Sequence, residues 1–500
     1  MAYSSFSDFL AALERAGELT RIPFPVATEL EITAWADREM KSAGGGKALL
    51  FEQPTVGGAV SKFPLAINTM GSQRRMAMAL GVEHVDELMR KMELILKAKP
   101  PTSLKHAWTL AMQGLDLLHA KPKHVKDGAC KEVVVRFDRS PITDHRSQFP
   151  TLLDLPILQC WPKDGGRFIT FPCVHTRDPD TGERNLGMYR MQVYDDRTTG
   201  MHWQVHKVGA RHGKRYYERG ERMPVAVTLG GDPAYTFAAT APLPDGLDEI
   251  LFAGFVRRKS VELVKCETID LDVPADVDVV IEGYVQPGES RAEGPFGDHT
   301  GFYTPVDEYP VFHITAITHR RDAVYPCTIV GIPPMEDFHM GSASVRIFLP
   351  VLRMNFPELV DIALPAEGVF HNLVFVSIRK QYAWQAFKVM HGLWGMGQMM
   401  FSKYIVVVDE DCDVHNTSEV LFRLCANTDP QRDTTFIKNP TDALDHAQSI
   451  ACMGSHMGID ATRKLASEGC ARPWPELLRM DAAVQARVAG LVEQLMSGRA

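Results

Sequence analysis

The sequence lacks closely paired cysteines, a long apolar run and an excess of positive charge. Its nine cysteines are scattered with no C-x-x-C pair, a pattern typical of reduced, buried thiols. No apolar stretch approaches the length of a membrane span, and the N-terminus has neither the basic start nor the apolar core of a signal peptide. A formal net charge of −8 argues against nucleic acid as the main partner. We therefore expect a cytoplasmic globular protein that does not bind nucleic acid.

Length and composition indicate several domains. The chain has 500 residues, too many for one ordinary domain, and its 45% hydrophobic and 23% charged residues match soluble globular proteins. Helical and strand-like patterns share residues 1–125, short β-rich runs fill 126–322, and helices alternate with strands in 323–472. This order predicts an α/β domain, a β-barrel or sandwich, and a second α/β domain. The tail, 473–500, is helical from Trp474 to Met496, and its periodicity does not choose between docking on its own domain and on a neighbouring subunit.

Seven short runs rich in β-branched and aromatic residues predict the strands of the central region. They are Val133–Phe137, Phe168–Phe171, Met188–Tyr194, Pro224–Leu229, Val261–Cys266, Val279–Val285 and Val311–Thr318. Alternation along the third run would put Met188 and Arg190 on one face and Tyr189 on the other. The N-x-G-x-Y-R pattern that contains Arg190 is weak by itself, because such an arginine is more often a surface ion pair.

The loop Glu293-Gly294-Pro295-Phe296-Gly297-Asp298-His299-Thr300-Gly301 follows one of these strands. Its three glycines and its proline give the backbone an unusual path. That path holds two carboxylates and an imidazole, groups suited to proton transfer once their geometry is set. The alternative is a plain turn between strands, whose Asp and Thr side chains bond their own backbone.

Two histidines, His202 and His206, have the spacing of a metal pair on a helix. The glutamate of the H-E-x-x-H motif is missing and Gly200 precedes the pair, so a zinc hydrolase is disfavoured. A structural role for both histidines is the alternative.

Acidic residues stand before the apolar run that begins at Ile250. Such residues usually cap a helix, and we assign Asp245 to that role. Glu249 is then free to turn inward as a metal ligand. An asparagine oxygen, an imidazole and a carboxylate suit a divalent ion such as Mn²⁺ that keeps room for a phosphate oxygen.

In their order and spacing, four segments resemble the UbiD family of prenylated-FMN-dependent decarboxylases: N-L-G-M-Y-R, M-H-W-Q-V-H-K, L-D-E-I-L-F-A-G and E-G-P-F-G-D-H-T-G-F-Y. Five further segments extend the likeness from end to end: F-L-A-A-L-E-R-A-G-E-L, C-W-P-K-D, P-P-M-E-D, R-K-Q-Y-A and G-S-H-M-G-I-D-A-T. The resemblance is to the bacterial 4-hydroxy-3-polyprenylbenzoate decarboxylases of ubiquinone synthesis in particular. Each segment is of modest specificity, but their ordered combination is specific.

The resemblance implies an N-terminal α/β domain, a central split β-barrel of the flavin-reductase type, and a C-terminal α/β domain with a helical tail. The catalytic set that it implies is Arg190, Glu293 and Asp298. The implied metal ligands are Asn185, His206 and Glu249, which hold Mn²⁺, with K⁺ as an optional second ion, against the cofactor phosphate. The implied cofactor contacts are Met188, Tyr189, Arg190, His202, Trp203, Gln204, Lys207 and Val208.

The implied activity is that of a carboxy-lyase: non-oxidative decarboxylation of a 4-hydroxybenzoate-type acid, with prenylated FMN as electron sink. The likeness favours 4-hydroxy-3-polyprenylbenzoate in ubiquinone biosynthesis, and the alternative is a small phenolic acid or a menaquinone precursor, because pocket shape decides the substrate. A metal-dependent hydrolase and a non-catalytic flavin-binding protein are less favoured, given the full set of acidic and metal positions. The resemblance also implies a flavin prenyltransferase that supplies the cofactor, a homo-oligomer (dimer or hexamer), and peripheral association with the inner membrane.

Within this set we assign Asp298 as the acid that delivers the proton. Arg190 is always charged, so it should hold the substrate carboxylate and depress the pKa of Glu293, while burial should raise the pKa of Asp298. Carboxylates with separated pKa values fit an acid/base assignment.

The chain departs from the family pattern at three places. It has His202-Trp203-Gln204 where the bacterial enzymes have Arg-Trp-Leu, and Lys207-Val208-Gly209 where they have Arg-Gly-Gly. Arg463-Lys464-Leu465-Ala466 replaces the usual Trp-Pro pattern after residue 462. These changes leave the catalytic set intact and bear on the substrate and on the cofactor contacts. Four methionines fit either a long apolar channel or ordinary core: Met390, Met396, Met399 and Met400.

Overall fold

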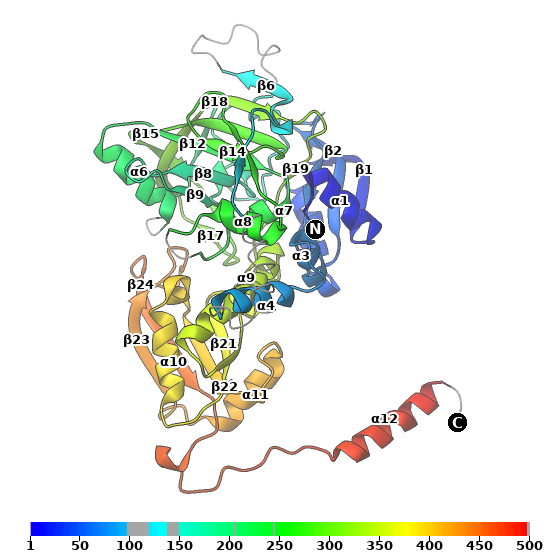
Figure 1. Ribbon diagram of the computed structural model, residues 1–500, viewed down its shortest axis with the longest axis vertical. Coiled ribbons are helices and arrows are strands. Elements are labelled where there is room, and N and C mark those ends of the chain that lie inside the picture. The colour runs from blue at the N-terminus through cyan, green and yellow to red at the C-terminus, as the bar shows by residue number, and fades with distance from the viewer. Residues whose placement is uncertain (1, 98–119, 138–149, 205–206, 244–245, 498–500) are drawn as a thin grey trace, which may run out of the picture.

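The computed structural model describes residues 2–97, 120–137, 150–204, 207–243 and 246–497 (Figure 1). His206 and Asp245, to which the sequence assigns roles, lie outside these ranges. Within them, no helix is long and apolar enough to cross a bilayer. All nine cysteines are free thiols, and five of them are buried as predicted; Cys425 is exposed, and Cys266, Cys452 and Cys470 are partly exposed.

The N-terminal part combines a sheet with helices, as predicted. α1 (Phe6–Arg15) begins where Ser5 Oγ accepts a hydrogen bond from Asp8 N at 3.0 Å, and it buries one apolar face. The other helices are α2 (Glu31–Met40), α3 (Gln73–Ala79) and α4 (Asp86–Leu96). The sheet order is β1 (Leu19–Ala27), β2 (Ala48–Val56), β4 (Leu65–Ile67) and β19 (Tyr325–Pro326), with β3 (Ala59–Val60) beside β2. Because β19 comes from far along the chain, it ties this sheet to the segment that leads into the C-terminal part.

A seven-stranded antiparallel sheet forms the central part. Its order is β11 (Thr198–Gly200), β18 (Asp307–His319), β15 (Val279–Glu293), β12 (Met223–Leu229), β8 (Cys173–Arg177) and β9 (Arg184–Gly187), with β6 (Val133–Arg136) beside β18. Shorter ladders join β10 (Met191–Gln192) to β7 (Phe168–Ile169), and β13 (Glu262–Lys265) to β14 (Asp272–Pro274) and β5 (Lys123–His124). The helices here are α6 (Val208–Glu218), α7 (Pro233–Ala238) and α8 (Glu249–Arg257); α6 packs against β9, β12 and β15. The predicted β-rich middle is confirmed.

The run predicted as one strand, Met188–Tyr194, is broken. β9 ends before it, and β10 covers only two of its residues. Arg190 O accepts a hydrogen bond from His202 N at 3.3 Å, so the backbone there bonds to a loop and not to a neighbouring strand. Tyr189 and Arg190 nevertheless face different surroundings, as the predicted alternation has them. Tyr189 is buried in the core, and Arg190 points to the loop after β15.

The loop after β15 folds into a small hairpin. β15 extends well past the predicted end at Val285, and β16 (Phe296–Gly297) pairs antiparallel with β17 (Tyr303–Thr304). Gly294 and Gly301 have φ values of 102° and 80°, a region that residues with a side chain rarely adopt. The glycines of this loop are therefore needed for its path.

The C-terminal part is an α/β unit, as predicted. Its sheet order is β20 (Leu359–Ala363), β21 (Leu373–Ile378), β22 (Tyr404–Asp409), β24 (Met453–Asp460) and β23 (Thr434–Pro440). The helices are α9 (Glu336–Asn355), α10 (Gln385–Trp394) and α11 (Thr417–Asn427). Met390 is fully buried in the core of this unit, and Met396 and Met399 pack against the same core. Met390 is therefore a core residue, whereas Met396, Met399 and Met400 are partly exposed.

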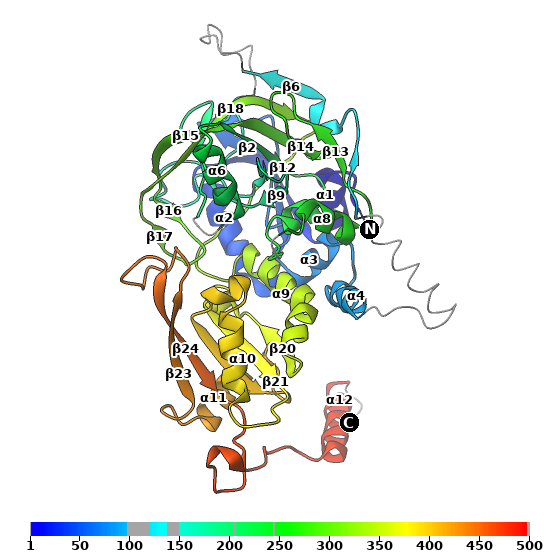
Figure 2. The same cartoon turned by 60° about the vertical axis from the view of Figure 1, so that its left-hand side comes forward.

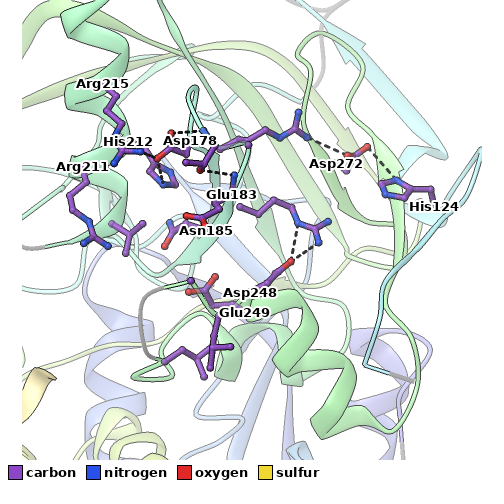
Figure 3. Close-up of a pocket in the computed structure, with 18 residues that line it drawn as sticks. His124, Asp178, Glu183, Asn185, Arg211, His212, Arg215, Asp248, Glu249 and Asp272 are labelled. Atoms are coloured by element: carbon purple, nitrogen blue, oxygen red, sulfur yellow. Dashed lines mark hydrogen bonds and ion pairs between the residues drawn. The ribbon is translucent and has the colours of Figure 1, made fainter. Parts of the chain in front are cut away.

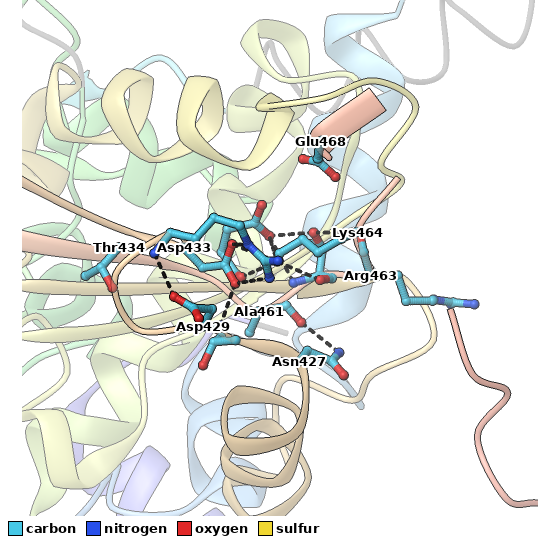
Figure 4. A network of polar contacts seen from close by, with 12 residues as sticks. Asn427, Asp429, Asp433, Thr434, Ala461, Arg463, Lys464 and Glu468 are labelled. Carbon is cyan, nitrogen blue, oxygen red and sulfur yellow. Dashed lines mark hydrogen bonds and ion pairs between the residues drawn. The ribbon is translucent and has the colours of Figure 1, made fainter. Parts of the chain in front are cut away.

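The segment Arg463–Ala466, which departs from the family pattern, is held by a buried polar network (Figure 4). Lys464 Nζ donates to the carbonyl oxygens of Asp460 at 2.6 Å and Thr462 at 2.8 Å. The same nitrogen lies 3.3 Å from a carboxylate oxygen of Asp460 and 3.7 Å from one of Asp433. The departure therefore has a structural role at the end of β24.

Lys464→Ala is expected to lower the free energy of unfolding by about 1 to 3 kcal/mol, because it leaves two buried carbonyl oxygens without their donor. The carboxylates keep other cations, since Lys380 pairs with Asp460 and Arg432 with Asp433. The lysine side chain is 2% exposed, whereas the neighbouring Arg463 is 48% exposed in its pairs with Asp409 and Asp411. Arg463→Ala is the matched control and should cost less than about 1 kcal/mol. Denaturant unfolding of both variants measures the difference, and equal losses would contradict the expectation.

The tail helix α12 (Ala482–Met496) starts later than predicted, at the cap formed by Asp481. In both views it stands away from the body of the molecule (Figures 1 and 2). All of its residues are exposed, so it buries no apolar side chain on the described part of its own chain. Docking on a neighbouring subunit stays a prediction.

Candidate active site

Arg190 joins the two carboxylates of the β15 loop. Its Nε and Nη2 donate to Glu293 Oε1 at 3.0 and 2.8 Å, and its Nη1 donates to Asp298 Oδ2. Nη2 also donates to Thr304 Oγ1 at 3.1 Å. The three side chains predicted as catalytic are at most 10% exposed. They lie in direct contact, although their roles stay a prediction.

The elements around this contact explain why it forms. Glu293 ends β15 and its side chain is fully buried. Asp298 directly follows β16, and the guanidinium of Arg190 lies 4.6 Å from the centre of the Phe296 ring on that strand. Thr304 on β17 and Phe296 had no role in the sequence analysis, although both belong to or adjoin the predicted loop. The hairpin thus brings both carboxylates to one arginine.

His202 contacts the catalytic set and does not lie on a helix. Its Nδ1 donates to Glu293 Oε2 at 2.9 Å, and its ring lies 4.2 Å from the Tyr309 ring. α6 begins only at Val208, so His202 does not lie on a helix, which agrees with disfavouring a zinc hydrolase built on the His202/His206 spacing. His202 holds the carboxylate of Glu293 in place.

Asp298 has a second set of partners on the opposite side from Arg190. Its Oδ1 accepts from His299 N at 2.7 Å and from His299 Nδ1 at 2.9 Å. His299 Nε2 lies 2.8 Å from Nε2 of His371, a residue of the C-terminal part. No sequence pattern pointed to His371, because it lies 72 residues from His299 in the sequence and meets it only in the folded chain.

Both loop carboxylates are held in the ionised form. Burial raises the pKa of Glu293, but the hydrogen bond from His202 and the charge of Arg190 outweigh it and lower the pKa below its ordinary value. Burial of Asp298 is likewise outweighed by its hydrogen bond to His299 and by the charge of Arg190, and its pKa lies well below the ordinary value. The expectation of a raised pKa for Asp298 is therefore wrong: burial does raise it, but His299 and Arg190 lower it by more.

A cavity of about 820 Å³ is lined by residues of β8, β9, α6 and the start of α8 (Figure 3). Its lining residues include Arg177, Asp178, Glu183, Arg184, Asn185, Val208, Arg211, His212, Arg215, Asp248, Glu249 and Asp272. Arg184, Arg215 and Arg177 pair with Asp248, Asp178 and Asp272 respectively. Glu249 has no such ion pair with any described residue.

Asn185 and Glu249, two of the three predicted metal ligands, line this cavity together. Glu249 Oε2 accepts a backbone hydrogen bond from Leu186 N at 3.0 Å, and burial raises the pKa of Glu249 to about 7. A partly buried carboxylate beside an amide oxygen, without a cation among the described residues, fits a divalent ion. The third ligand, His206, lies outside the described residues, and within them no group of three His, Cys, Asp or Glu side chains could hold a metal.

The cap of α8 differs from the expectation. Asp248 is the N-cap: its Oδ1 accepts from Ile250 N at 2.8 Å, while its Oδ2 accepts from Arg184. Asp245, assigned to this role from the sequence, lies outside the described residues. Asp248 caps the helix, and Glu249 lines the cavity with Asn185; its role as a metal ligand stays a prediction.

The predicted cofactor positions gather around the start of α6. Tyr189, His202 and Trp203 are buried, Met188, Gln204 and Lys207 are partly exposed, and Val208 lines the cavity. His202 Nε2 and Trp203 Nε1 are buried without a hydrogen-bond partner in the described part of the chain. Because buried polar atoms are nearly always paired, these two atoms fit contacts with a bound polar molecule.

Three family models match the chain in order. The N-terminal, Rift-related and C-terminal domains of 3-octaprenyl-4-hydroxybenzoate carboxy-lyase (UbiD) match residues 10–93, 133–333 and 338–461. Uncharacterised proteins of Archaeoglobus fulgidus and Aquifex aeolicus are 47% and 46% identical over 494 residues, with 98% and 99% of each chain covered. The chain therefore belongs to the UbiD family, and it is a carboxy-lyase.

Solved structures agree over the whole chain. The closed form of vanillic acid decarboxylase from Sedimentibacter hydroxybenzoicus has a TM-score of 0.83 at 27% identity, with 99% of both chains covered. The UbiD-class enzyme HmfF from Pelotomaculum thermopropionicum, in complex with FMN, has a TM-score of 0.77 at 27% identity, with 95% of this chain and 97% of that chain covered. The predicted fold class is confirmed.

Proposed function

We propose that the protein catalyses the non-oxidative decarboxylation of a 4-hydroxybenzoate-type aromatic acid with prenylated FMN. The observation that carries the proposal is the buried contact of Arg190 with Glu293 and Asp298, in a chain of the UbiD family. Two relatives support it. One acts on vanillic acid, and HmfF has been solved with FMN and with prenylated FMN.

When bound, prenylated FMN supplies an electron sink for the electron pair that departing CO₂ leaves on the ring carbon. His202 and Trp203, with their unpartnered nitrogens, would bind it together with the other residues gathered at α6. Asn185, His206 and Glu249 would hold Mn²⁺ against its phosphate, and K⁺ is the optional second ion. The mixed oxygen and nitrogen donors suit that metal.

The chain's own groups orient the acid and deliver a proton. Arg190 attracts the substrate carboxylate, and its bonds to Glu293 and Asp298 hold its guanidinium plane in one orientation. The C–C bond to CO₂ breaks, and a new C–H bond must form at the same carbon. Asp298 delivers that proton. Because its resting form is the carboxylate, Asp298 must take up a proton before it donates one.

Between the substrates, we favour a small phenolic acid over the prenylated precursor of ubiquinone. The match to a vanillic acid decarboxylase supports the small acid. Of the four methionines that could line a channel for a prenyl chain, Met390 is buried in the core instead. The family description, which names an octaprenyl substrate, supports the ubiquinone role as the second candidate.

Supplied side by side, unprenylated and prenylated 4-hydroxybenzoate are expected to differ, with faster turnover of the unprenylated acid by about tenfold or more. The expected factor is the scale of selectivity that pocket contacts usually supply. Product chromatography measures both rates on protein loaded with prenylated FMN, and unloaded protein is the control. Preference for the prenylated acid would return the ubiquinone role to first place.

We further propose three domains, with limits 1–125, 126–322 and 323–472. We also propose that a flavin prenyltransferase supplies the cofactor. The protein is, in this proposal, a homo-oligomer. A dimeric form of HmfF and the exposed tail helix support an oligomer, either dimer or hexamer. Peripheral association with the inner membrane accompanies only the ubiquinone role.

A further inference from the structure

A chain of three side chains links the proposed acid to the C-terminal part. Asp298 Oδ1 lies 2.9 Å from His299 Nδ1, and His299 Nε2 lies 2.8 Å from His371 Nε2. Figure 2 shows the β16–β17 hairpin beside the C-terminal part, where His371 precedes β21. His371 is not part of the catalytic set, and its contact with His299 is not explained by the roles proposed so far.

Elementary hydrogen bonding restricts the protons in this chain. The carboxylate of Asp298 accepts, so His299 Nδ1 carries a hydrogen. Of the two Nε2 atoms, one donates and the other accepts. If His299 donates, it is an imidazolium between a carboxylate and a neutral His371.

The surrounding charges favour that arrangement. Burial lowers the pKa of His299, but its hydrogen bond to Asp298 and the nearby carboxylates raise it above the ordinary value. Burial and the charge of His299 lower the pKa of His371 to about 4. The charged groups that act on the two rings are Asp298, Asp337, Asp442, Asp445 and Lys207. The shared proton therefore belongs to His299, and His371 Nε2 is its acceptor.

The backbone before His371 is strained in a way that fixes its ring. Val369 and Phe370 have φ values of 46° and 50°, which are rare for a β-branched and an aromatic residue. The Phe370 ring lies 5.5 Å from the His299 ring, so this strained turn packs directly on the histidine of the catalytic loop. Strained conformations of this kind persist only where the surrounding packing enforces them, and they are common at functional sites.

We propose that His371 is a positioning residue for proton delivery: by accepting the Nε2 hydrogen of His299 it keeps on His299 the proton that Asp298 passes to the product. The inference rests on the proposed function of Asp298. In the step, the His299 Nδ1–H bond breaks and an Asp298 Oδ1–H bond forms. That O–H bond then breaks as the product C–H bond forms, and His299 regains a proton from water. The scheme supplies the proton that ionised Asp298 lacks.

His371→Phe removes the acceptor, so the imidazolium of His299 should lose its proton at a lower pH, by about one unit or more. In the holoenzyme the alkaline limb of the plot of kcat against pH should shift to lower pH by the same amount. At pH values above that limb, kcat should then fall by about tenfold. KM and the rate at low pH should stay within about twofold. His371→Gln, whose amide oxygen accepts a hydrogen bond, should restore the wild-type profile.

The matched control is His446→Phe. The His446 ring lies 4.1 Å from the Phe302 ring, tilted by 41°, and no hydrogen bond links His446 to Asp298 or His299 among the described residues. Its pH profile should be that of the wild type. An unchanged profile in His371→Phe, or a His371→Gln profile no better than that of His371→Phe, would overturn the proposal.

Titration of ¹³C-labelled histidine without substrate separates this inference from the proposed function. The His299 resonance, assigned with His299→Gln, should titrate at lower pH in folded His371→Phe than in the wild type. If the wild type fails to decarboxylate but this shift is seen, the proposed function fails and the His371 contact stands. If decarboxylation depends on Asp298 and the shift is absent, the inference fails alone.

Discussion

Asp298→Asn is expected to reduce turnover by about a hundredfold or more, the usual scale for a positioned general acid. Asparagine keeps the size of the side chain and accepts hydrogen bonds, but it cannot give up a proton as an acid. Asp298 is 8% exposed and held between Arg190 and His299, so its carboxyl is placed rigidly near the reacting carbon. Flavin and metal should stay bound, because the described side-chain partners of Asp298 are Arg190 and His299, and neither Asn185 nor Glu249 is among them.

Turnover is measured on protein loaded with prenylated FMN, together with deuterium exchange into the product carbon, which should fall in parallel. Asp307→Asn is the matched control: Asp307 is an exposed carboxylate that pairs in register with Glu293 on the neighbouring strand. It should behave as the wild type. Turnover of Asp298→Asn near the wild-type rate would mean that the acid lies elsewhere, and Glu293 would be examined first.

Glu249→Ala is expected to abolish binding of flavin and metal together. In the proposed site the ion joins the protein to the cofactor phosphate, so losing one ligand releases both. Two carboxylates of the cavity, Glu183 and Glu249, have no arginine partner among the described residues. Of the two, Glu249 is the partly buried one, and burial raises its pKa to about 7. A divalent ion would compensate the negative charge of Glu249. Alanine has no carboxylate, so the ion loses one of its proposed ligands.

The measurement is the absorption spectrum and metal content of protein co-expressed with a flavin prenyltransferase. Glu183→Ala is the control, because Glu183 is an exposed acid that lines the same cavity. It should keep full occupancy of both. Full flavin occupancy in Glu249→Ala after chelation would contradict the bridging role of the ion.

The local sequence pattern determined those elements whose conformation depends on residues close by in the sequence. Ser5 before apolar residues at helical spacing predicts α1, and the cap forms as expected. The glycines of Glu293–Gly301 predict a special loop, and Gly294 and Gly301 adopt positive φ there. The order of the motifs along the whole chain added the family, and with it the grouping of Arg190 with residues more than a hundred positions away.

Only the tertiary structure decided the features that depend on distant contacts. The Met188–Tyr194 run leaves the sheet because its backbone bonds to a loop, which strand propensity cannot report. His371 meets His299 across 72 residues of sequence, and no local pattern marks it. The pKa of Asp298 falls although the residue is buried, because Arg190 and His299 lie against it. Burial could be foreseen from the apolar surroundings, but the sign of the shift follows from which charges the fold brings within bonding distance.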